Sequence, residues 1–116
     1  MKSYTDLSQS NVLAEIMPIG SADMWYHGHY SPWESESKYD NEPCPFHSMS
    51  PNWDKPCWSL AALLSVVSEE VSLNSFKDGN WNAMVQQNGK MIYSDANNPV
   101  DACVAMIEKL HEQNLL

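Results

Sequence analysis

The sequence predicts an α+β fold: a small antiparallel sheet, made of a three-stranded meander with one extra strand, and about three helices packed on one face. Two tight-turn dipeptides, Asp78-Gly79 and Asn88-Gly89, separate short segments of strand-like composition. Apolar residues recur at helical spacing on both sides of those segments. The length of 116 residues suits one domain, so residues 1–116 are expected to share one core.

The N-terminal quarter predicts a helix followed by a strand. Residues 3–17 carry a ragged apolar stripe, Ser3 or Thr5 is the expected N-cap, and Pro18 ends the helix. Between residues 22 and 30 the pattern changes to a period of two, which is typical of a strand. His27 and His29 are then expected on the same side of that strand.

Residues 31–57 show no sustained periodicity and hold most of the prolines. Such composition alone favours disorder, but this stretch also carries several large aromatic residues, which disordered segments usually lack. We therefore expect an ordered irregular loop, with Trp58 buried directly behind it. Of the aromatic residues inside the loop, the candidates for a partner-binding surface are Trp33, Tyr39, Phe46 and Trp53.

The C-terminal half alternates between helix and strand signals. A second helix is expected from Ser59, a good N-cap, with an apolar face at helical spacing. The strands of the meander are expected at residues 71–77, 81–87 and 90–95. The last helix begins at Asn98 and Pro99, a favourable cap and first residue. Three methionines are interpreted as core filler: Met84, Met91 and Met106.

Charge and cysteine content exclude several classes of function. Fifteen acidic residues against six lysines, with no arginine, give a net charge of -9. Nucleic acids and anionic membranes repel such a chain, so neither is an expected partner. The first residues lack the apolar core of a signal peptide, and three widely spaced cysteines are not a disulfide framework. A cytoplasmic protein with reduced thiols is the expectation.

Three segments carry a resemblance: Ser21–Met24, Pro56–Leu64 and Asn98–Cys103. Together they resemble a family of short uncharacterised proteins from gut Bacteroidetes and their phages or prophages. The resemblance covers most of the chain apart from residues 27–55. It implies an intracellular, phage-related setting and implies no activity.

A zinc site is the most specific chemical hypothesis. Two histidines one residue apart, a Cys-x-x-His pair and one further cysteine supply enough nitrogen and sulfur ligands for a tetrahedral ion. The candidate ligands are His27, His29, Cys44, His47 and Cys57. The alternative is that the histidines face solvent and the cysteines simply pack. Zinc is the one cofactor that the sequence suggests.

Cys57 is also the one candidate nucleophile. It precedes the second helix, whose free N–H groups and dipole can lower the pKa of a thiol. A cysteine hydrolase also needs a base with an orienting group, and neither His47 nor His111 has an evident one. The alternative is a small buried residue at a helix start. No catalytic residue is therefore assigned, and an enzyme is the less favoured class.

The favoured function is a non-enzymatic interaction protein that binds a protein partner or a second copy of itself through the aromatic loop. One variant of this hypothesis is an acidic decoy that occupies a DNA-binding protein. A zinc-binding domain is the alternative from another class, and a Cys57 hydrolase is third. In each case the loop of residues 31–57 can instead serve as cover for the sheet.

Overall fold

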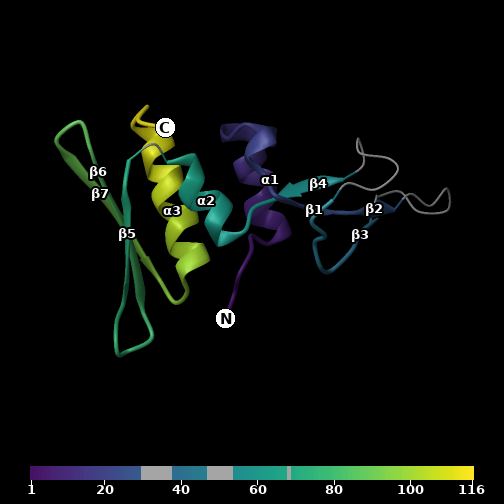
Figure 1. The fold of residues 1–116 in the computed structure, drawn as a ribbon, viewed down its shortest axis with the longest axis horizontal. Coiled ribbons are helices and arrows are strands. Elements are labelled where there is room, and N and C mark those ends of the chain that lie inside the picture. The colour runs from purple at the N-terminus through teal and green to yellow at the C-terminus, as the bar shows by residue number, and fades with distance from the viewer. Residues whose placement is uncertain (30–37, 47–53, 68) are drawn as a thin grey trace.

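The structure, a computed structural model, describes residues 1–29, 38–46, 54–67 and 69–116. Within these residues the fold is α+β, as the sequence predicts. It has three α-helices, two two-stranded sheets and one three-stranded sheet. The three-stranded sheet stands at one end, the helices form the middle layer, and the short strands lie at the other end (Figure 1). The described chain measures 51 × 31 × 23 Å.

Helix α1 (Leu7–Ile16) begins four residues later than residue 3, and its N-cap is Asp6. The side chains of Asp6 and Gln9 form a reciprocal capping box with each other's backbone N–H groups. The prediction that Ser3 or Thr5 caps this helix is wrong. Thr5 is fully buried and its hydroxyl bonds with the backbone N–H of Trp58 and the Ser10 hydroxyl, which leaves Asp6 to satisfy the N–H groups of the first turn.

The strand predicted at residues 22–30 is two short strands that separate at His27. Strand β1 (Met24–Tyr26) pairs with β4 (Lys55–Cys57), and β2 (Gly28–His29) pairs with β3 (Lys38–Tyr39). These strands form their own sheets and do not extend the meander. The expectation of an irregular loop is wrong at β3 and β4, while residues 30–37 and 47–53 of that loop lie outside the described part of the chain.

The two later helices begin where the sequence predicts. Helix α2 (Leu60–Val66) has Ser59 as its N-cap, with the side chain accepting from the Ala62 N–H. Helix α3 (Pro99–Glu112) has Asn98 as its N-cap. A short 3-10 helix, η1 (Ile19–Ser21), follows α1. Trp58 is fully buried, as predicted, and its indole N–H donates to the Ser21 hydroxyl.

Strands β5 (Val71–Ser75), β6 (Trp81–Gln87) and β7 (Lys90–Ala96) form the predicted antiparallel meander in that order. Gly79 and Gly89 both have positive φ, which the two tight turns require. Helix α3 packs on one face of this sheet against β6 and β7 (Figure 1). The inward-facing sheet residues and the apolar side of α3 make one core: Ala83, Val85, Ile92, Val100, Cys103, Val104, Ile107 and Leu110.

Candidate binding surfaces

The outer face of the three-stranded sheet carries exposed apolar side chains. Alternation along β7 buries Ile92 and Ser94 beneath α3 and turns Met91 and Tyr93 outward. Met91 is 57% exposed and Tyr93 is 54% exposed. Met84 on β6 pairs directly with Tyr93 and is half-buried. These three residues, Met84, Met91 and Tyr93, are named the Met-Tyr face.

The interpretation of all three methionines as core filler is therefore wrong for two of them. Met106 on α3 is fully buried, but Met84 and Met91 lie on the sheet face that α3 does not cover. The strand period decides this outcome, because residues an odd number of positions from Ile92 must point away from the core. Figure 1 shows no described helix or strand on that side of the sheet.

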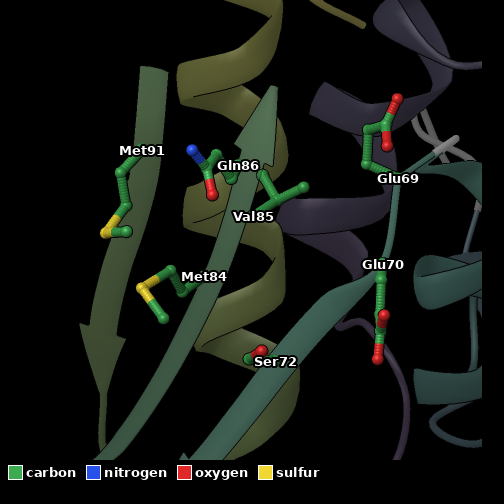
Figure 2. Close-up of a pocket in the computed structure, with 7 residues that line it drawn as sticks. All are labelled: Glu69, Glu70, Ser72, Met84, Val85, Gln86 and Met91. Carbon is green, nitrogen blue, oxygen red and sulfur yellow. The ribbon is translucent and has the colours of Figure 1, made fainter. Parts of the chain in front are cut away.

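A hollow of about 340 Å³ opens where the chain enters β5 next to β6. Figure 2 shows Met84 and Met91 on one side of it and Glu69 and Glu70 on the other. Both glutamates are exposed. The remaining lining residues are Ser72, Val85 and Gln86. Methionine side chains and carboxylates thus line the same hollow, with Val85 and Gln86 between them in Figure 2.

A second hollow of about 350 Å³ follows the edge of β7 that pairs with no described strand, and it shares Met91 and Tyr93 with the Met-Tyr face. Lys109 of α3 reaches this edge. Its ammonium group donates to the Tyr93 carbonyl at 2.7 Å and lies 5.5 Å from the centre of the Tyr93 ring. The lysine therefore fixes Tyr93 by a charge-assisted hydrogen bond and a cation–π contact.

The aromatic residues that the sequence predicts as a binding surface lie at the other end of the molecule or outside the described residues. Tyr39 is half-buried, with the Lys55 ammonium 5.1 Å from its ring centre. Phe46 is 62% exposed, and its ring centre lies 6.0 Å from that of His27. Trp33 and Trp53 lie outside the described residues, so their part in a binding surface stays a prediction.

The candidate zinc ligands make separate contacts. The His27 Nε2 lies 2.9 Å from the Phe46 carbonyl oxygen, whereas the His29 Nε2 lies 2.6 Å from the Asp40 carboxylate. Cys44 is half-buried and its backbone pairs with Trp25. His47 lies outside the described residues. Among the residues that are described, no three His, Cys, Asp or Glu side chains gather as a metal site would require.

Cys57 belongs to a buried polar cluster, named the Thr5 cluster, that is formed by Thr5, Ser10, Tyr26, Cys57 and Trp58. Its thiol is fully buried and donates to the Thr5 carbonyl at 3.3 Å, and the Tyr26 hydroxyl donates to the same oxygen at 2.7 Å. Burial raises the pKa of the Cys57 thiol and outweighs its hydrogen bond with Thr5. The expectation of a lowered thiol pKa is therefore wrong in direction. A buried, protonated thiol is a poor nucleophile.

Comparisons with known protein families, with curated proteins and with solved structures find no match to this chain. The resemblance to phage-related proteins therefore stays a prediction. No α-helix in the described ranges has both the length and the apolar character needed to cross a membrane.

Proposed function

We propose that this chain is a non-enzymatic, cytoplasmic protein-binding domain that holds a segment of another protein against the Met-Tyr face. The observation that carries the proposal is the exposure of Met91 and Tyr93 beside half-buried Met84 on one sheet face. Exposed apolar residues that adjoin one another on a soluble domain are typical of interaction sites. The cytoplasmic setting is supported by the unpaired number of cysteines in the sequence.

The face combines a rigid base with adaptable side chains. Strand β6 is paired on both sides, and α3 packs behind β6 and β7, so the backbone of the face is held in place. Methionine side chains are flexible and polarisable, and they suit surfaces that accommodate varied apolar partners. Tyr93 adds a large ring that Lys109 holds in position.

The charges around the face favour a basic and apolar partner segment. Glu69 and Glu70 line the hollow opposite the two methionines, and the whole chain carries a net charge of -9. Lysine or arginine side chains flanking an apolar residue would place their charges near these carboxylates. An acidic partner segment would be repelled at the same place.

The test uses selective labelling of the methionine methyl groups and a titration with defined peptides. Three synthetic peptides of equal length are compared: basic and apolar, basic without apolar residues, and acidic and apolar. The basic and apolar peptide is expected to shift the Met84 and Met91 methyl signals and to leave that of buried Met106 unchanged. The other two peptides are expected to bind at least tenfold more weakly.

A pair of variants separates the two candidate surfaces. The double variant Met91→Gln and Tyr93→Thr keeps strand-compatible side chains but removes the apolar surface, and it is expected to abolish the shift of the Met84 methyl signal, which remains as the reporter. Phe46→Ser, at the opposite end, is the matched control and is expected to bind normally. Loss of binding in Phe46→Ser alone would move the function to the aromatic surface, and equal binding of all three peptides would refute the proposal.

A further inference from the structure

We propose that a second copy of this chain pairs with the free edge of β5, so that two meanders form one continuous six-stranded sheet. In the described residues β5 lies at the end of the strand order β5-β6-β7 and pairs only with β6. Its sequence, VSLNS, contains no charged residue, proline or glycine. Sheet edges without such residues are templates for pairing with another strand.

The turn after β5 fixes which backbone groups point to the open edge. The Phe76 N–H donates to the Asn80 carbonyl at 2.9 Å, next to the Ser75–Trp81 pair. Hydrogen-bonded and non-hydrogen-bonded pairs alternate along antiparallel strands. Ser72 and Asn74 therefore direct their N–H and C=O groups towards β6. Val71, Leu73 and Ser75 direct theirs outward.

The other edge of the sheet differs from β5 in a way that discourages pairing. The same alternation places Tyr93 among the outward-facing residues of β7, and its carbonyl already accepts from Lys109. The ends of β7 also carry Lys90 and Asp95. Charged side chains on an edge strand are a common protection against association. The sheet thus has one protected edge and one open edge.

One register satisfies the whole open edge of β5. Placing Leu73 opposite Leu73 of the second copy puts Val71 opposite Ser75, so every outward N–H and C=O of the strand gains a partner. In the same antiparallel register the end of β5 that follows Glu69 lies beside the end of the second copy's β5 that precedes Lys77, so Glu69, just before the strand, comes near Lys77 in the turn after it. Both are exposed and oppositely charged. Sliding the strands by two residues loses both features.

The two-fold axis of this register passes between the two copies of Leu73, and this placement is compatible with the packing of their side chains. Leu73 is half-buried at the edge of the core, and its side chain would meet its own copy on the helix-covered side of the extended sheet. The α3 helices of both copies would lie on that same side. We assign the edge to a second copy and not to an unrelated peptide because the antiparallel register brings Glu69, before β5, near Lys77, after β5 in the other copy.

Sedimentation velocity over a range of protein concentrations tests the proposal. A single strand pair makes a small interface, so we expect a dimer with a dissociation constant of roughly 10–100 µM. Ser75→Pro removes one outward N–H without touching the bonds to β6 and is expected to weaken the dimer at least tenfold. Met91→Pro makes the same change at an outward position of β7 and is the matched control, with no expected effect on the dimer.

A charge exchange tests the register itself. Glu69→Lys and Lys77→Glu each bring like charges near one another at the two ends of the strand pair and are expected to weaken the dimer, while the double variant is expected to restore it. A monomer at every concentration would overturn the proposal, and so would a dimer that Ser75→Pro leaves intact or a double variant no better than the single ones. The Met-Tyr variant, Met91→Gln with Tyr93→Thr, is expected to dimerise normally, which separates this inference from the proposed function.

Discussion

Replacing Thr5 by valine should destabilise the fold through the loss of a single hydroxyl group. Valine keeps the shape of threonine, and Thr5 is fully buried, so the change removes hydrogen bonds with little change in volume. The Thr5 hydroxyl accepts from the backbone N–H of Trp58 at 3.1 Å. It also lies 2.8 Å from the hydroxyl of Ser10, which is fully buried as well. The variant leaves both groups without this partner.

The magnitude follows from those two groups. A buried donor or acceptor that loses its partner costs about 1–3 kcal/mol. With the backbone N–H of Trp58 and the Ser10 hydroxyl both affected, the free energy of unfolding should fall by about 2–6 kcal/mol. Thr5→Ser keeps the hydroxyl and loses one methyl group, so it should cost only about 1 kcal/mol.

Urea unfolding followed by tryptophan fluorescence measures the free energy of unfolding of both variants. Trp58 is a suitable probe because it is fully buried and its backbone N–H bonds with the Thr5 hydroxyl. The order of stability should be wild type, Thr5→Ser, then Thr5→Val. If Thr5→Val lowers the free energy of unfolding by less than about 1 kcal/mol, or if Thr5→Ser lowers it equally, the hydrogen bonds of the Thr5 hydroxyl are not what stabilises the Thr5 cluster.

Two further predictions concern titratable groups. Partial burial opposes ionisation of Asp101, but hydrogen bonds from Lys2, Gln9 and Asn98 outweigh it and hold the pKa of this carboxyl below its usual value. Its contribution to stability is therefore present above the unfolded pKa of about 4 and is lost as the pH falls through the lower folded pKa. Lys2→Met should accordingly be less stable than wild type at pH 7, and urea unfolding should show this gap closing well below pH 4; a constant gap would contradict the assignment. Burial raises the pKa of the Cys57 thiol, and raises that of Cys103 to about 11. A thiol reagent at mild pH should modify half-buried Cys44 first, as measured by mass spectrometry. Modification of Cys57 at the same rate would contradict its burial.

Local signals in the sequence were sufficient for the meander and the last two helices. The turns at Gly79 and Gly89 require positive φ, and Ser59 and Asn98 cap helices with their own side chains. Each of these signals acts within a few residues. For that reason no knowledge of the rest of the fold was needed to place those elements.

The errors arise where distant segments meet. Strand β1 is held by residues about thirty positions away in β4, and neither strand is long enough to show a clear alternation. The contact of Thr5 with Trp58, far along the chain, removes Thr5 from the role of helix cap, and the local sequence carries no signal of that contact. The Met-Tyr face, in contrast, was within reach of the sequence, because strand alternation around Ile92 already places Met91 and Tyr93 together on one side.

The position of Lys109 connects the two proposed interactions. If β7 paired with another chain, the new strand would lie beside Met91 and Tyr93 and would cover part of the Met-Tyr face. The bond from Lys109 to the Tyr93 carbonyl occupies the outward acceptor nearest the middle of β7 and at the same time holds the tyrosine ring. The proposed self-association uses β5, which lies on the opposite edge of the sheet. In the proposed dimer both Met-Tyr faces then remain open on the same side of one extended sheet, where a partner with two basic and apolar segments would gain from a high effective concentration.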